Sequence, residues 1–369
     1  MPKVLRIDKG VEEGIQELLK FLLESKKVKG VFALKRINEK GAVAYSLITD
    51  PALLKDVLPF FPLMPANAAK LLSHFTLIGP LNEPIAVVAR PCELRAFIEL
   101  VKRKQGYLEN FLFISSTCGG VYPLKMAVNG ELNEKIPQYW EAIKKGGNAP
   151  DIRDTCKGCE HFLPYTADIT VALIGKKDID KRCEIFLNTD KGEKSVDGMK
   201  GEVIKGEIET KEVKDLKSER KEEKEKLFRE VKVEEFGMKG LIETFGRCIG
   251  CRGCRKACPI CFCGLCFFDS QVNEYKPHTY EIELEKRKGL RVPPDTLFYH
   301  LGRLTHMSVS CVGCGMCADV CPANIPLSTI FLKVGESVQD VFDYLPGKDV
   351  EEKVPVTTFE PEELAEVEK

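Results

Sequence analysis

Apolar side chains recur at helical spacing near the start of the chain, between residues 11 and 23. The positions i, i+4, i+7, i+8, i+11 and i+12 form one face of an amphipathic helix. They are occupied by Val11, Ile15, Leu18, Leu19, Leu22 and Leu23. A short apolar run at residues 30–34 follows and predicts a strand. Helical and strand patterns continue to alternate up to about residue 200.

Further apolar runs, rich in β-branched residues, predict buried strands at residues 84–89, 111–114 and 168–174. Helical spacing predicts helices at residues 53–60, 68–75 and 93–104. Strands that alternate with helices indicate an α/β domain, here a mostly parallel sheet with flanking helices. We place this domain at residues 1–204.

Two cysteines of this region each follow a predicted strand. Cys92 comes after the strand at 84–89, and Cys118 comes after the strand at 111–114. Functional sites of open α/β sheets gather outside the carboxyl ends of the strands. We therefore expect both thiols at one edge of the sheet, with the pair Cys156 and Cys159 on a loop over that edge.

A charge-dense segment follows the α/β region. Residues 211–235 contain nine basic and nine acidic side chains in 25 positions. Opposite charges at i,i+4 spacing support a solvated helix. We predict an exposed connecting helix in a linker at residues 205–244, and a docking surface is the alternative.

Eight of the sixteen cysteines form two copies of the pattern C-x2-C-x2-C-x3-C-P, which holds pairs of [4Fe–4S] clusters in bacterial ferredoxins. The first three cysteines of a copy share one loop, and the fourth, before proline, serves the other cluster. One predicted cube is therefore held by Cys248, Cys251, Cys254 and Cys321. The second is held by Cys311, Cys314, Cys317 and Cys258. Structural zinc, which prefers two C-x2-C pairs, is the weaker alternative.

The spacing of the two copies predicts the fold around them. Between Cys266 and Cys311 there are 44 residues, too many for a minimal ferredoxin. Helical spacing at residues 296–307 favours an all-helical ferredoxin domain at residues 245–345, followed by a tail at 346–369.

Three cysteines near the first copy remain without an assignment: Cys261, Cys263 and Cys266. They can be buried thiols behind a cluster, alternatives to Cys258, or ligands of a further metal.

The cysteines of the α/β region form a candidate third site. Cys92, Cys118, Cys156 and Cys159 supply four soft ligands with one C-x2-C pair, which suits zinc and [4Fe–4S] equally. Buried thiols without a metal are the third possibility. Cys183 lies in a strand-like segment and is expected to be structural.

Composition narrows the class of protein. The chain has 55 basic and 56 acidic side chains and a formal net charge of −1, which argues against binding to nucleic acid. The first residues lack the apolar stretch of a signal peptide, and no apolar run is long enough for a membrane span. We expect a cytoplasmic protein, where many cysteines indicate metal or redox chemistry rather than disulfides.

Several stretches, in order along the chain, together resemble the beta subunits of hydrogenases and formate dehydrogenases that use the deazaflavin coenzyme F-420. The likeness to formate dehydrogenase beta subunits is the more specific, and it runs from about residue 10 to about residue 350. The motifs that support it are Arg90–Ala96, Ser116–Gly120, Cys156–Cys159, Ala167–Val171, Arg247–Cys263, Gly302–His306 and Tyr344–Gly347.

The resemblance implies an iron–sulfur partner of a molybdenum or tungsten formate dehydrogenase catalytic subunit. It also implies an FAD in the first domain and three [4Fe–4S] clusters in all. The third cluster then falls on Cys92, Cys118, Cys156 and Cys159. Arg303 and His306 belong to a family motif near a cluster, where a hydrogen bond could tune its potential; for His306 an ordinary core position is the alternative.

The chain departs from this family where a flavin phosphate would bind. Family members have a Gly-Gly turn that opens the first helix, but here acids stand in that turn, within Asp8–Gly14. The remaining candidate flavin contacts are Lys35, Arg36, Asn67 and Lys70, for which ordinary surface polarity is the alternative.

Two functions follow from these residues. In the first, clusters pass single electrons to a flavin, which converts them to the hydride of coenzyme F-420. In the second, the chain has no flavin and relays electrons between a hydrogenase or formate dehydrogenase and another complex, such as one resembling heterodisulfide reductase.

Overall fold

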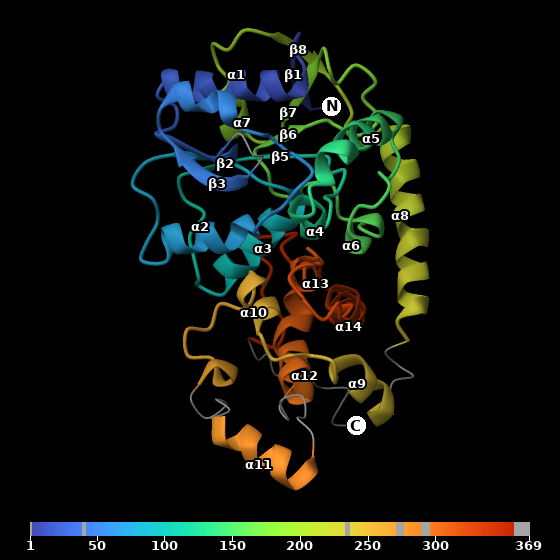
Figure 1. Cartoon of the computed structure of the whole chain (residues 1–369). Coiled ribbons are helices and arrows are strands. Elements are labelled where there is room, and N and C mark those ends of the chain that lie inside the picture. Colours follow the sequence, from blue (N-terminus) through green and yellow to red (C-terminus); the bar gives the residue numbers. More distant parts are fainter. Residues whose placement is uncertain (1, 39–41, 233–236, 271–276, 289–295, 358–369) are drawn as a thin grey trace, which may run out of the picture.

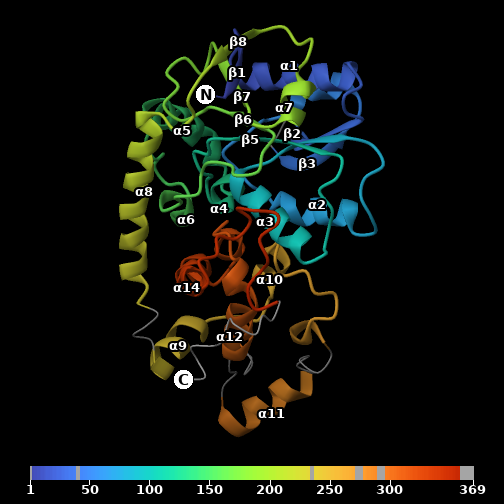
Figure 2. The ribbon, with the colours of Figure 1, turned by 180° about the vertical axis from the view of Figure 1, so that it is seen from behind.

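The computed structural model describes residues 2–38, 42–232, 237–270, 277–288 and 296–357. Figure 1 shows the β-sheet with its helices at one end of the molecule and a group of helices at the other. The long helix α8 (Lys211–Glu230) runs along the side of both parts, as the view from behind in Figure 2 also shows.

The N-terminal part contains one eight-stranded sheet with the order β3-β2-β4-β5-β6-β7-β1-β8. Its strands are β1 (Lys3–Ile7), β2 (Gly30–Arg36), β3 (Val43–Ile48), β4 (Ile85–Val88), β5 (Phe111–Ser116), β6 (Ile169–Val171), β7 (Cys183–Leu187) and β8 (Glu202–Lys205). Only the pairs β2–β4, β4–β5 and β5–β6 are parallel, and the other four are antiparallel. The α/β class is confirmed, but the expected mostly parallel sheet is wrong: the sheet is mixed.

The mixed character comes from four antiparallel strands, of which only β7 lies in a segment that was expected to be strand-like, around Cys183. Strands β1, β3, β7 and β8 all join by antiparallel pairing. In β1, Lys3 pairs with Leu187 of β7 and with Lys205 of β8. These pairs connect segments almost 200 residues apart, so nothing local in the sequence indicates them.

Helices α1 (Val11–Glu24), α2 (Ala68–Thr76) and α3 (Pro91–Lys102) confirm three of the predicted helices. The helix predicted at residues 53–60 is wrong. A short 3-10 helix, η1 (Pro51–Asp56), ends before Val57, which is extended and forms a bridge with Lys35. Pro59 and the left-handed backbone of Phe60, with φ of 55°, prevent the helix from continuing.

The described residues of the C-terminal part form helices and loops and contain no strand, as predicted for an all-helical domain. Its α-helices are α9 (Gly237–Phe245), α10 (Gly253–Ala257), α11 (Pro277–Arg287), α12 (Thr296–Met307), α13 (Met316–Asp319) and α14 (Leu327–Val341), with 3-10 turns η3 (Phe267–Asp269) and η5 (Ser308–Ser310). The sheet region also contains the helices α4 (Leu124–Val128), α5 (Leu132–Lys145), α6 (Asp154–Lys157) and α7 (Asp190–Ser195).

The two parts share a hydrophobic core. One continuous cluster of buried side chains contains Phe97 of α3 and Phe113 of β5 together with Met307 of α12 and Phe331 of α14. Helices α12 and α14 of the C-terminal part therefore pack directly against helices α2 and α3 of the sheet region. The predicted division at residues 204, 244 and 345 stays a prediction, because this core crosses it.

Helix α8 is not the simple exposed connection that its charges suggested. Val213, Leu216 and Arg220, at i, i+3 and i+7, are buried along one face. The helix contacts α6 and α14, one from each part of the molecule. Most of its other charges face solvent, which is why the sequence pattern appeared uniformly polar.

The C-terminal tail is fastened to α3 through a buried carboxylate. Glu99, which has no exposed surface, accepts hydrogen bonds from the Tyr344 hydroxyl at 2.5 Å and from the Gly347 amide at 2.9 Å. Gly347 has a φ of 68°, and a side chain there would collide with the Arg95 backbone. This accounts physically for the Tyr-Leu-Pro-Gly segment.

None of the helices in the described part of the chain combines the length and apolar character that a membrane crossing needs.

Replacing Tyr344 with Phe removes the hydroxyl that donates to the buried Glu99 carboxylate. We expect the free energy of unfolding to fall by about 1.5–3 kcal/mol, the range for a hydrogen bond to a charged group. Anaerobic urea unfolding, followed by circular dichroism, measures it. Tyr107→Phe is the matched control, because Tyr107 is 42% exposed and a surface change of this kind costs less than about 0.5 kcal/mol. Equal stabilities of the two variants would contradict the proposed tie.

Candidate iron–sulfur sites

Two parallel strands place the first pair of thiols. Cys92 is the second residue of α3, which begins just after β4, and Cys118 follows the end of β5. Strands β4 and β5 are parallel neighbours, so their carboxyl ends meet at the same edge. The short helix α6 and the turn after it bring Cys156 and Cys159 to that edge.

All four of these cysteines line one small cavity. Arg90, Arg220 and His161 also contribute to its wall, as does the Gly313–Cys314 segment of the C-terminal part. We call this space the sheet-edge cavity.

Burial controls the protonation of these thiols. It raises the pKa of Cys156 to about 12, and it raises the pKa of Cys92 well above the usual range. The Gly120 amide donates to the Cys118 sulfur at 3.4 Å. Buried thiols are protonated at neutral pH unless a bound metal displaces the proton, so these residues are suited to soft metal ligation rather than to nucleophilic chemistry.

A second cavity lies in the C-terminal part, between α12, α14 and the loop before α13. It is small, and Cys258, Cys311, Cys314 and Cys317 are all in its wall. Burial raises the pKa of Cys311 to about 11, although the Gly313 amide opposes this shift. We call this space the central cavity, and it brings together one complete predicted ligand set.

The two cavities share part of their walls. Gly313 and Cys314 line both spaces. The Arg153 guanidinium lies at the same junction: it donates to the Cys314 carbonyl at 3.2 Å and to the Met64 carbonyl at 3.1 Å, and it forms a buried ion pair with Asp319.

The remaining set, Cys248, Cys251, Cys254 and Cys321, lies farther from the sheet. Burial raises the pKa of Cys248, and the neighbouring thiols Cys254, Cys251 and Cys321 raise it further, while a hydrogen bond from the Gly250 amide lowers it. Cys248 and Cys254 are buried, but Cys251 is exposed. This outer set is therefore the one that meets solvent.

Arg303 of α12 connects the outer set with the central cavity. Its guanidinium donates to the Cys254 sulfur at 3.1 Å and to the Cys254 carbonyl at 3.3 Å, and its side chain lines the central cavity. The other residue of that motif, His306, is exposed, so the core position expected for it is wrong.

The three unassigned cysteines differ in environment. Cys261 is next to Cys258, and a hydrogen bond with the Cys258 thiol raises its pKa; its sulfur also contacts that of Met307 at 3.4 Å. Cys263 is exposed, and Cys266 is only partly buried. Cys183 begins β7 and has no exposed surface, as expected for a structural thiol.

Two of the candidate flavin contacts, Lys35 and Arg36, lie at the end of β2, and the other two, Asn67 and Lys70, lie at the start of α2. Lys35 forms an ion pair with Asp56 at 3.7 Å. Arg36 lies near Glu12. Partial burial raises the pKa of the Glu12 carboxyl, and the positive charge of Arg36 opposes part of this shift.

The other two candidates are engaged elsewhere. The Asn67 side chain caps α2 by accepting from the Ala69 amide at 3.0 Å. Lys70 donates to the Lys256 carbonyl at 2.9 Å.

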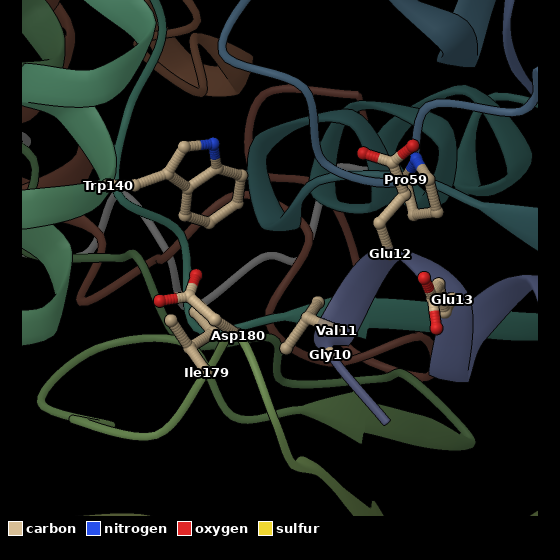
Figure 3. A pocket seen from close by; sticks show the side chains of 8 residues that line it. All are labelled: Gly10, Val11, Glu12, Glu13, Pro59, Trp140, Ile179 and Asp180. Carbon is tan, nitrogen blue, oxygen red and sulfur yellow. The ribbon is translucent and has the colours of Figure 1, made fainter.

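A separate open pocket of about 740 Å³ lies at the N-terminus of α1. Figure 3 shows Trp140 and Asp180 facing Glu12 and Glu13 across it. This is where a flavin phosphate would approach the helix, but three carboxylates line the pocket. The first helical amide, that of Val11, already donates to the Ile179 carbonyl at 2.9 Å. The residues present do not fit an anionic phosphate.

The chemistry of the cysteine sets is uniform. Each set supplies four thiols, the soft ligands of iron–sulfur clusters. Among the described residues, no group of three or more His, Cys, Asp or Glu side chains is arranged to hold a single metal ion.

Two residues at these sites could not be recognised from the sequence. Arg153 and Arg220 both line or bridge cavities, but they are two of 55 basic residues. Arg220 stands in a segment where charges alternate, so only its burial distinguishes it.

Comparisons with known proteins support a pair of clusters in the C-terminal part. Residues 243–325 match the model of the 4Fe-4S dicluster domain. The F-420-dependent formate dehydrogenase subunit beta of Methanocaldococcus jannaschii is 29% identical over 375 residues, which covers 91% of this chain and 92% of that protein. The subunit beta of F-420-dependent formate dehydrogenase 1 of Methanococcus maripaludis is 29% identical over 401 residues, with coverages of 94% and 93%.

Among solved structures, a chain of the F-420-reducing NiFe hydrogenase complex from Methanosarcina barkeri is 14% identical. It matches 64% of this chain and 94% of that chain, with a TM-score of 0.45.

The resemblance inferred from the motifs is confirmed. Similarity over more than nine-tenths of this chain and of both relatives makes the protein a homologue of the beta subunits of F-420-dependent formate dehydrogenases, with a 4Fe-4S dicluster domain in its C-terminal part.

Proposed function

We propose that this chain is the iron–sulfur electron-transfer subunit of an oxidoreductase complex of the formate dehydrogenase type. It would hold three [4Fe–4S] clusters. The outer cluster is assigned to Cys248, Cys251, Cys254 and Cys321, the central cluster to Cys258, Cys311, Cys314 and Cys317, and the sheet-edge cluster to Cys92, Cys118, Cys156 and Cys159.

The observation that best supports this proposal is the shared wall of the two cavities. Because Gly313 and Cys314 line both spaces, clusters in them would be separated by little more than a single segment of chain. Arg303 makes the corresponding link between Cys254 and the central cavity. The central set therefore borders both of the other sets, and we infer that clusters in the three sets would form a row, as an electron relay requires.

The row has one end at the surface. Cys251 of the outer set is exposed, whereas the four cysteines of the sheet-edge cavity are only partly exposed. Clusters held by these thiols would supply one-electron transfer in which no bond is made or broken. A redox partner would exchange electrons at the outer cluster, and the potentials of the clusters would set the direction.

The relatives suggest the partner. Both are named as subunits of F-420-dependent formate dehydrogenases. We infer a catalytic subunit that contains molybdenum or tungsten and removes two electrons from formate, delivered to this chain one at a time. A hydrogenase would serve as the same kind of partner.

The fate of the electrons distinguishes two versions of the proposal. The acidic pocket at α1 does not fit a flavin phosphate, and this favours a flavin-free relay to a further complex, such as one resembling heterodisulfide reductase. The names of the relatives favour the second version, in which electrons reach coenzyme F-420.

Three clusters predict about twelve iron and twelve acid-labile sulfide per chain of anaerobically purified protein. Cys156→Ser should reduce both to about eight, because it removes a ligand of the sheet-edge cluster alone. Cys183→Ala is the control: this thiol is buried in β7, outside both cavities, and should keep twelve. Eight iron in the unaltered protein would contradict the third cluster, and complete loss of iron in Cys156→Ser would contradict independent sites.

Flavin content decides between the two versions. The relay predicts far less than one flavin per chain, even after anaerobic reconstitution with excess FAD, because Glu12, Glu13 and Asp180 repel a phosphate at α1. Flavin released by acid and measured by fluorescence, normalised to iron, is the readout. One FAD per chain would refute the relay and lead directly to assays of F-420 reduction.

A further inference from the structure

Helix α8 inserts one charged side chain into the protein. Of its twenty residues, only Val213, Leu216 and Arg220 are buried. Arg220 is 1% exposed and is the largest fully buried side chain of the described chain. A guanidinium is costly to remove from water, so its burial requires compensating contacts.

The contacts of Arg220 lead to the sheet-edge cavity. Its Nε donates to the Asn148 side-chain oxygen at 2.9 Å, and its Nη1 donates to the carbonyls of Cys118 at 3.2 Å and Cys159 at 3.5 Å. Its guanidinium lies 4.7 Å from the centre of the Phe162 ring. The side chain thus touches two of the four assigned ligand residues and forms part of the cavity wall.

These contacts leave part of the guanidinium unused. Its Nη2 is buried and has no hydrogen-bond partner. No ion pair joins it to a carboxylate of the described residues. Arg153, at the other side of the cavity wall, differs in this respect, because Asp319 balances its charge. The positive charge of Arg220 is therefore not balanced by a carboxylate of the described residues.

We propose that Arg220 tunes the reduction potential of the sheet-edge cluster, whose sulfur atoms would accept the hydrogen bond that Nη2 lacks and whose negative charge would balance the guanidinium. The proposal rests on the assignment of a cluster to this cavity. Four thiolates make the cluster anionic, and the carbonyl contacts of Nη1 fix the guanidinium beside the Cys118 and Cys159 backbone.

The consequence is a higher reduction potential for this one cluster. Reduction adds one electron and one negative charge to it, and no proton or ligand is exchanged. A fixed positive charge and a hydrogen bond to sulfur both stabilise the reduced form more than the oxidised form. Arg220 would therefore make the sheet-edge cluster an easier electron acceptor than it would otherwise be.

The test is a redox titration of the anaerobic full-length protein, followed by electron paramagnetic resonance. Arg220→Gln should keep about twelve iron per chain. At a fixed potential near the midpoint of the sheet-edge cluster, the ratio of reduced to oxidised cluster should fall about tenfold, which corresponds to about 59 mV for one electron. The signal that disappears in Cys156→Ser identifies the cluster. The other two should titrate as in the unaltered protein.

Two further variants make the result specific. Arg220→Lys keeps the charge without the planar fork, and its potential should lie between those of the Gln variant and the unaltered protein. Lys224→Gln removes a charge one turn along α8, where Lys224 pairs with Glu160 at 2.5 Å and Glu336 at 2.9 Å. It should leave all three potentials unchanged.

The outcomes separate this inference from the proposed function. Twelve iron and an unshifted sheet-edge potential in Arg220→Gln would overturn the inference alone. Loss of the cluster in both Arg220 variants would also overturn it, because Arg220 would then hold the site together without tuning it. Eight iron in the unaltered protein would remove the third cluster and with it the proposed function as stated.

Discussion

Arg153 and Asp319 form the ion pair that joins the two parts of this protein where their cysteine sets meet. Both side chains are buried, at 4% and 7% exposure. Arg153 also donates to the carbonyls of Met64, in the sheet region, and Cys314, in the helical region. Breaking a buried pair leaves an unpaired charge, at a cost of about 3–5 kcal/mol. The pair therefore fixes the relative position of the sheet-edge and central cavities, and the spacing of any clusters within them depends on it.

The buried charges of Glu99, Arg303 and Arg220 each need hydrogen bonds or an opposite charge to balance them. Glu99 is satisfied by donors from its own helix and from the tail, so its role is to fasten the chain. Arg303 donates to the sulfur of Cys254. Arg220 has no acidic partner among the described residues and borders a space lined by four thiols. Burying a cation beside sulfur ligands costs little free energy only when a bound anionic cluster balances its charge. The folding of the cysteine-rich regions is therefore linked to the assembly of their cofactors.

The α/β region could be predicted in part. Amphipathic spacing located α1 and α3, and apolar β-branched runs located β2, β4 and β5, because these elements bury one face or both faces by themselves. The antiparallel strands β1 and β8 were missed, since a strand paired with a distant segment has no local marker. The error at residues 53–60 had another cause: apolar spacing was helical, but Pro59 and the backbone at Phe60 ended the turn early.

The sequence by itself determined the ligand chemistry. Two C-x2-C-x2-C-x3-C-P runs specify which thiols share a loop, because cluster geometry constrains spacing within a few residues. Cys92 and Cys118 could also be placed at one sheet edge, because neighbouring parallel strands end together. Only the tertiary structure decided that Gly313 and Cys314 separate two adjacent cavities, that Arg220 turns inward from a charged helix, and that carboxylates occupy the pocket at α1. The reason is that burial and charge compensation arise from contacts between segments far apart in the chain, which residue spacing does not encode.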